Sequence, residues 1–229
     1  MKLYIGNKTY SSWSMRPWVL MRALHIAFEE VFVPFDGFGP DAEFKKTMAA
    51  LHPLATVPVL EQDGLIIADT QAITEYLAET YPTAGIWPSD KRDRAIARQL
   101  VAAMHSGFAG LRGHCPMNIG VDLEDIGRTL YQTHENLRND IARLETLLTP
   151  HCENEFLFGS FSAVDAFYAP VMSRIETYCL PISDALKAYQ ERVLSHPAVQ
   201  DWYQDAKAEN IFLDFEEPYR ASESEIKPL

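Results

Sequence analysis

Two adjacent serine hydroxyls near the N-terminus are the side chains of this sequence best placed to do chemistry. Ser11 and Ser12 follow an apolar segment at residues 3–5, which predicts a strand, and they precede an apolar pattern at residues 19–24, which predicts a helix. A hydroxyl at such a junction lies beside the positive end of the helix dipole and can donate a hydrogen bond to an anion. The alternative is that the two serines only cap the helix.

The net charge of the chain limits the partners that these hydroxyls could serve. Its 229 residues are 47% apolar, enough for a substantial core, and they include 20 basic and 32 acidic side chains, a formal charge of −12. Because this charge repels polyanions, neither nucleic acid nor an anionic membrane is expected as a partner. A small anionic ligand responds to local donors and stays compatible with it.

The sequence also bears on location and on metals. No apolar run approaches the ~20 residues of a membrane-spanning helix, and residues 1–6 lack a secretory apolar core, so a cytoplasmic location is expected. Three scattered cysteines show no metal-ligand spacing, namely Cys115, Cys152 and Cys179. We therefore expect neither a disulfide framework nor a bound metal.

The first eighty residues alternate between strand and helix signals. Asp63 and Gly64 separate two apolar segments, which is a strong hairpin signal. The predicted order of elements is βαβαββα, the thioredoxin arrangement. Strands are predicted at residues 3–5, 31–35, 57–60 and 65–68, and helices at residues 17–27, 42–51 and 71–81.

The rest of the chain is predicted to be helical. Prolines and a glycine punctuate residues 82–90, a predicted linker, and no strand pattern follows it. A continuous apolar stripe predicts one long helix over residues 96–111. The predicted fold class is therefore α/β followed by all-α, with a thioredoxin-like domain at residues 1–81 and an all-helical domain at residues 91–229.

This architecture and four local motifs resemble the cytosolic glutathione S-transferase family over essentially the whole chain. Each motif is short, but their order and spacing together are specific. The motifs are a serine segment similar to that of zeta-class and related bacterial members (Ser11–Ser14), a cis-proline segment (Thr56–Leu60), an acidic segment (Asp69–Ile73) and a helix capping box (Ser162–Asp165). The resemblance implies glutathione as co-substrate, no metal, and a symmetric homodimer.

Two of these motifs are where the resemblance places glutathione. A proline within a strand interrupts the hydrogen bonding of that strand, so Pro58 requires an edge position or a cis bond. In the family this bond is cis, and the resemblance implies that the preceding residue, here Val57, pairs with the cysteinyl backbone of glutathione. Asp69 and Thr70 precede a helix whose N-terminus attracts a carboxylate. Thr70 could hold the carboxylate of the γ-glutamyl group and Asp69 its ammonium, with simple capping as the alternative.

The residue that would bind the glycyl carboxylate of glutathione is not identified by the motifs. Many relatives have a lysine just before the Val-Pro pair, where this chain has Ala55 and Thr56. Lys45 or Lys46 could substitute, and the sequence does not select between them.

The resemblance also implies a mechanism. A serine hydroxyl, Ser11 in the first place and Ser12 as the alternative, would stabilise the thiolate of glutathione by a hydrogen bond. The thiolate would then attack a small electrophile between the domains. The residues assigned to this electrophile pocket are Trp13, Met104, Phe108 and Arg112.

Two other functions stay open. One is glutathione-dependent cis–trans isomerisation of an unsaturated diacid such as maleylacetoacetate, which ranks below conjugation because the zeta-class motif has cysteine where this chain has Trp13. The other is glutathione binding without turnover, as a carrier or regulatory protein.

Overall fold

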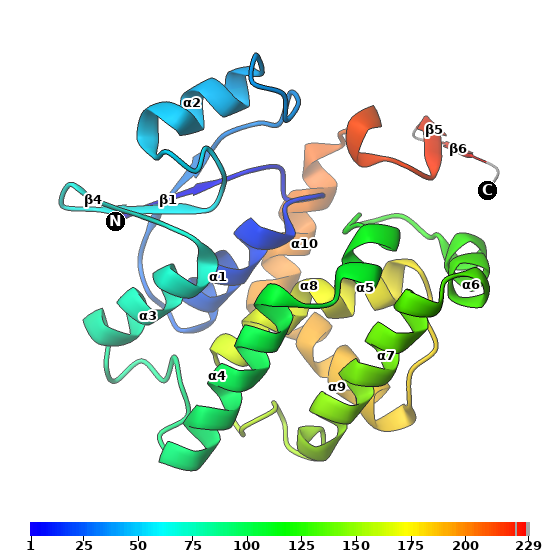
Figure 1. The fold of residues 1–229 in the computed structure, drawn as a ribbon. Coiled ribbons are helices and arrows are strands. Elements are labelled where there is room, and N and C mark those ends of the chain that lie inside the picture. Colours follow the sequence, from blue (N-terminus) through cyan, green and yellow to red (C-terminus); the bar gives the residue numbers. More distant parts are fainter. Residues whose placement is uncertain (223, 228–229) are drawn as a thin grey trace.

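The computed structural model describes residues 1–222 and 224–227, and its N-terminal part has the predicted order of elements (Figure 1). Strand β2 ends before Pro34, which has no N–H to donate to a neighbouring strand, so it lies earlier than the predicted residues 31–35. The elements are β1 (Lys2–Ile5), α1 (Ser12–Ala23), β2 (Glu29–Phe32), α2 (Glu43–Leu51), β3 (Val59–Gln62), β4 (Leu65–Ala68) and α3 (Thr70–Thr80).

The four strands form one mixed sheet in the order β2-β1-β3-β4. Strand β1 is parallel to β2 and antiparallel to β3, and β3 is antiparallel to β4. The predicted hairpin is confirmed, since Asp63 and Gly64 both have positive φ, as a two-residue turn of this kind requires. The central strand β1 thus leads directly into the loop that carries the two serines.

The second part of the structure is helical, as predicted, but the long helix expected over residues 96–111 is two helices. Phe108 is left-handed with φ 57°, and a Cβ at Gly107 would lie 2.6 Å from the Ala103 carbonyl oxygen, so the chain turns where only glycine fits. The helices are α4 (Lys91–Ser106), α5 (Ala109–His114), α6 (Glu124–Thr133), α7 (Glu135–Leu148), α8 (Ala163–Thr177), α9 (Asp184–Ser195) and α10 (Pro197–Glu209).

After α10 the chain returns to the loop that follows β1. This C-terminal segment contains the short 3-10 turn η2 (Asp214–Glu216) and a small antiparallel pair, β5 (Arg220–Ser222) and β6 (Glu225–Ile226). The prediction of no strand after residue 90 misses this pair, because these short strands are mostly polar. The boundaries predicted between the two domains stay a prediction. Within the described ranges, no helix is long and apolar enough to cross a membrane.

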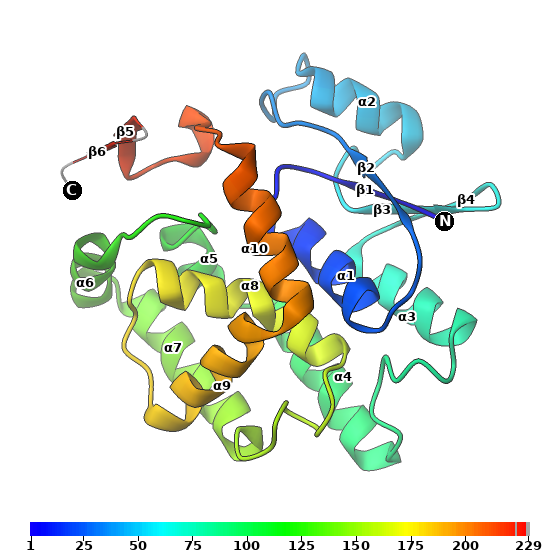
Figure 2. The ribbon, with the colours of Figure 1, turned by 180° about the vertical axis from the view of Figure 1, so that it is seen from behind.

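Helix α1 joins the two parts of the molecule, because it packs against both α8 and α10 (Figure 2). One apolar cluster continues from β1 through α1 into the helices. Helix α8 is almost wholly buried and begins with the predicted capping box, in which Asp165 accepts a hydrogen bond from the Ser162 N–H at 3.0 Å. Burial raises the pKa of Asp165 to about 6. The fold therefore sets the end of α8 beside the start of α1.

Candidate functional site

A cavity of about 560 Å³ opens where the loop after β1 meets the helical part. Its walls come from residues 10–13, from α2 and the loop before it, from residues 56–57, from α5 and the residues after it, and from single side chains of α8 and η2. Across the described residues, no three His, Cys, Asp or Glu side chains gather as metal ligands would. The polar side chains that line the cavity include hydroxyl, cationic and carboxyl groups.

Ser11 and Ser12 both line this cavity, and neither side chain caps α1. Ser11 occupies the N-cap position, but its Oγ forms a 2.7 Å hydrogen bond with Ser14 Oγ, which also accepts the Gly6 N–H at 3.2 Å. Ser12 Oγ accepts a hydrogen bond from Arg174 Nη2 at 3.2 Å. Simple capping of the helix is therefore not what these hydroxyls do.

The Val57–Pro58 peptide bond is cis, which is the arrangement that the family resemblance implies. Pro58 is buried beside the start of β3, and Val57 lines the cavity. Among the described residues, the backbone N–H and C=O of Val57 have no hydrogen-bond partner. The segment thus presents a donor and an acceptor at the wall that faces the serines.

Asp69 and Thr70 lie at the start of α3, outside the lining of the cavity. Asp69 caps the helix through Oδ1, which accepts from the Gln71 N–H at 2.8 Å, and its Oδ2 is 3.2 Å from His105 Nε2. Asp69 also has φ 80°, a strained conformation of the kind that clusters at functional sites. Thr70 is fully buried, and its Oγ1 has no hydrogen-bond partner among the described residues. Asp69 is therefore the cap of α3, whereas the Thr70 hydroxyl makes no hydrogen bond within the described residues.

The structure shows which of the two lysines, Lys45 or Lys46, lies at the cavity. Lys45 lines the cavity, and its Nζ donates to the Ala55 carbonyl at 2.9 Å. Lys46 points away and pairs with Glu43 at 2.7 Å, with both side chains mostly exposed. Lys45 is thus the cation on the α2 side of the cavity.

The predicted electrophile residues divide into two pairs. Trp13 and Arg112 line the cavity, with the Arg112 guanidinium 5.0 Å from the centre of the Trp13 ring. Met104 and Phe108 do not, because they are 0% and 1% exposed and belong to the apolar core, where the Phe108 ring packs edge-on against Tyr168. Their assignment to the pocket is therefore corrected: helical spacing identified a buried face, but that face meets α8 rather than the cavity.

Two charged residues of the cavity were not identified from the sequence. Arg174 lies in α8, where a single arginine within an apolar helix was the available signal, and Glu216 lies in η2. Burial, reinforced by Glu217, raises the pKa of Glu216 to about 7, and Arg174 opposes this shift. The helical side of the cavity therefore combines cations with a carboxyl group that titrates near neutrality.

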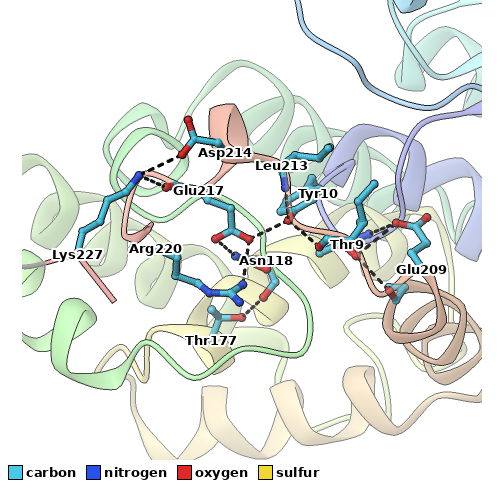
Figure 3. A network of polar contacts seen from close by, with 12 residues as sticks. Thr9, Tyr10, Asn118, Thr177, Glu209, Leu213, Asp214, Glu217, Arg220 and Lys227 are labelled. Carbon is cyan, nitrogen blue, oxygen red and sulfur yellow. Dashed lines mark hydrogen bonds and ion pairs between the residues drawn. The ribbon is translucent and has the colours of Figure 1, made fainter. Parts of the chain in front are cut away.

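The C-terminal segment is fastened to the serine loop by a buried carboxylate (Figure 3). Glu217 is 1% exposed and accepts hydrogen bonds from the Tyr10 hydroxyl at 2.8 Å, from Asn118 Nδ2 at 2.7 Å and from Arg220 Nη1 at 3.0 Å. Burial and this bond raise the pKa of Tyr10 well above its usual range. The network holds Glu216 at the cavity and engages the Tyr10 phenol, which belongs to the residue before Ser11.

Comparison with known proteins identifies the class to which this fold and site belong. The profile of the glutathione S-transferase N-terminal domain matches residues 10–80. A glutathione S-transferase of Arabidopsis thaliana is 42% identical over 194 residues, which cover 81% of this chain and 72% of that protein. A maleylacetoacetate isomerase of Rattus norvegicus is 25% identical over 209 residues, 86% of this chain and 93% of that protein. The chain belongs to the glutathione S-transferase family.

Solved structures share the fold. A glutathione transferase homologue from Burkholderia, with bound glutathione, has a TM-score of 0.69 and 24% identity, over 90% of this chain and 98% of that one. A glutathione transferase from Methylococcus capsulatus has a TM-score of 0.67 and 23% identity over the same shares. At these identities the likeness establishes the architecture alone.

Proposed function

We propose that this protein binds glutathione, stabilises its thiolate with a serine hydroxyl, and adds the thiolate to a small electrophile in the same cavity. The observation that carries the proposal is the position of Ser11 and Ser12, whose hydroxyls line one cavity with Val57 of the cis-proline segment and do not cap α1. Conjugation is the reaction that such a site supports best.

The energetics of thiol activation are within reach of this site. A free thiol has a pKa of ~8.5, so little thiolate exists at neutral pH. Lowering that pKa by about two units requires about 3 kcal/mol of preferential stabilisation of the thiolate. One or two charge-assisted hydrogen bonds supply this amount, and the N-terminus of α1 adds to it.

Glutathione would be oriented by groups around the serines. The free backbone N–H and C=O of Val57 would pair with its cysteinyl residue, and Lys45 would bind its glycyl carboxylate. Asp69 and Thr70 would receive the γ-glutamyl group at the start of α3, although neither lines the cavity in this structure. These assignments leave the wall formed by Trp13 and the helical part for the electrophile.

Calorimetric titration with glutathione, combined with thiolate absorbance of the complex against pH, tests the proposal. We expect binding, with a bound thiol pKa about two units below the free value. The double variant Ser11→Ala, Ser12→Ala should keep most of the binding and lose the shift. Binding with an unshifted thiol would favour the carrier function, and no binding would refute the proposal.

A second candidate function is isomerisation of an unsaturated diacid, with glutathione adding and then leaving. It is favoured by two guanidinium groups at the cavity, those of Arg112 and Arg174, which have no carboxylate within ion-pair distance in the described part of the chain. A curated relative carries the name maleylacetoacetate isomerase. Conversion of a cis diacid to its trans isomer without consumption of glutathione would establish this reaction.

We further propose, from the family alone, a cytoplasmic protein that forms a symmetric homodimer. Light scattering at micromolar concentration should give twice the chain mass of 26.0 kDa. A particle of the single-chain mass would refute the dimer.

A further inference from the structure

The two serines of the cavity differ in the group that reaches the hydroxyl oxygen. Ser12 Oγ is 3.2 Å from Arg174 Nη2. Because a guanidinium can only donate, Ser12 Oγ is the acceptor in this bond, and its own proton must point elsewhere. Among the described residues no acceptor takes that proton, and Ser12 lines the cavity. The Ser12 hydroxyl therefore has a donor proton available to a ligand.

Arg174 is held rigidly in this position. Its Nε donates to the Cys115 carbonyl at 2.8 Å and its Nη1 to the Pro170 carbonyl at 3.3 Å, so each nitrogen of the guanidinium has an acceptor. The residue is 5% exposed and makes no ion pair in the described ranges. A fixed, planar guanidinium loses little freedom when its third acceptor, Ser12, donates to an anion.

The two hydroxyls are consequently not equivalent. Ser11 Oγ donates its proton to Ser14 Oγ at 2.7 Å, and Ser14 Oγ also accepts the backbone N–H of Gly6. This neutral pair ties the helix start to the end of β1. Ser12, by contrast, is bonded to a buried cation, and a hydrogen bond assisted by charge is roughly twice as strong as a neutral one.

We propose that Arg174 is a positioning residue for thiol activation: it holds the Ser12 oxygen as an acceptor, so that the Ser12 hydroxyl donates its proton to the glutathione sulfur. The bond from the guanidinium polarises the Ser12 hydroxyl and so strengthens the hydrogen bond that this hydroxyl donates to the thiolate. The inference rests on the proposed function and deepens it by selecting Ser12 over Ser11 as the donor.

The groups around Arg174 leave this charge in place at neutral pH. Burial, followed by repulsion from Arg112, lowers its pKa only to about 10. Arg16 of α1 is a second neighbouring cation, and Glu216 of η2 the neighbouring carboxyl group. Burial also raises the pKa of the Cys115 thiol to about 12, so that thiol is neutral.

The phenol of Tyr178 is a further titratable neighbour of Arg174, and burial raises its pKa well above its usual range. It is therefore neutral as well. The local charge is positive, and a thiolate at Ser12 would be the anion that balances it.

The pKa of the glutathione thiol, measured by thiolate absorbance in the bound complex, tests the inference. We expect Ser12→Ala and Arg174→Met each to raise it by about one unit, a tenfold loss of thiolate below the pKa. Arg174→Lys, which keeps the charge, should raise it less. Ser11→Ala is the matched control, with the same atom removed one residue away, and should give the smaller shift.

A double-mutant cycle separates this role from a structural one. If Arg174 acts through Ser12, the variant Ser12→Ala, Arg174→Met should show no larger shift than the greater of the two single variants. Additive shifts, an unchanged thiol pKa in both Arg174 variants, or a larger shift in Ser11→Ala than in Ser12→Ala would overturn the inference.

Failure of the inference can be told from failure of the proposed function. An unshifted thiol in the wild-type complex refutes the proposed function itself. If the pKa of the thiol is lowered in the wild-type complex but is the same in the Arg174 variants, only the inference is refuted. Should Arg174→Met fail to fold by circular dichroism, the comparison of Ser12→Ala with Ser11→Ala still decides which serine is the donor.

Discussion

The two walls of the cavity are built in different ways. The wall assigned to glutathione comes from the N-terminal part and uses local backbone geometry, namely the start of α1 and the cis bond before β3. The opposite wall consists of side chains from α5, α8 and η2, brought together from distant parts of the sequence. One wall can be fixed by short motifs, whereas the other exists only after the helices and the C-terminal segment have packed.

The largest effect is expected from removing the anchor of the second wall. Glu217→Ala deprives the Tyr10 and Asn118 side chains of a buried acceptor, so we expect a loss of about 3 kcal/mol in the free energy of unfolding. Urea denaturation measures it. Asp214→Ala, an exposed carboxylate of the same segment, is the control and should change stability by less than about 0.5 kcal/mol. Equal effects of the two variants would contradict a structural role for Glu217.

The next largest effects are expected when one cation is removed from each wall, which tests whether the two walls bind different substrates. Lys45→Met should weaken glutathione binding about fivefold, an effect of about 1 kcal/mol, because a carboxylate partner is lost. Arg112→Met should instead raise KM about tenfold for an electrophile with a carboxylate, and little for a neutral one.

Initial rates with each substrate varied in turn, together with calorimetry of glutathione, measure both changes. The two substitutions are matched, since each keeps an apolar stem and removes a charge. If either variant altered both constants to the same extent, the assignment of the walls to different substrates would be wrong.

The smallest effect concerns pH and the carboxyl group of the second wall. The pKa of Glu216 rises from 4.5 to about 7 in the folded protein, mainly through burial. The folded state then binds a proton more tightly than the unfolded chain, so the free energy of unfolding falls as the pH rises through this interval. Since Glu216 is only partly buried, we expect a decline of about 1 kcal/mol.

Glu216→Gln should remove that decline. Urea denaturation of both proteins at about pH 4 and about pH 8, below and above this interval, makes the comparison. A wild-type decline that persists undiminished in the variant would show that another group is responsible.

Features that depend on neighbouring residues were predictable from the sequence. The Asp63–Gly64 hairpin and the capping box of Ser162 and Asp165 each follow from a few adjacent residues and appear as expected. Their information is local because turn and capping geometry are local. The cis bond at Pro58 is also present, but the adjacent residues alone allow an edge position as well, and it is the family resemblance that favours cis.

Features that depend on the packing of distant elements were not predictable in the same way. Met104 and Phe108 have helical apolar spacing, which indicates that a face is buried but not what buries it, and here α8 does. Arg174 and Glu216 were missed because each reaches the cavity only through the course of α8 and of the C-terminal segment. The sequence does not distinguish Lys45 from Lys46, because the two adjacent lysines differ only in the direction of their side chains on α2.

The bond between Tyr10 and Glu217 has a consequence for biosynthesis. Its two partners are 207 residues apart in the chain. At a translation rate of roughly 5–20 residues per second, the Tyr10 phenol waits on the order of ten to forty seconds before its acceptor has been made. The serine loop is thus completed by a residue that is synthesised 207 positions after Tyr10.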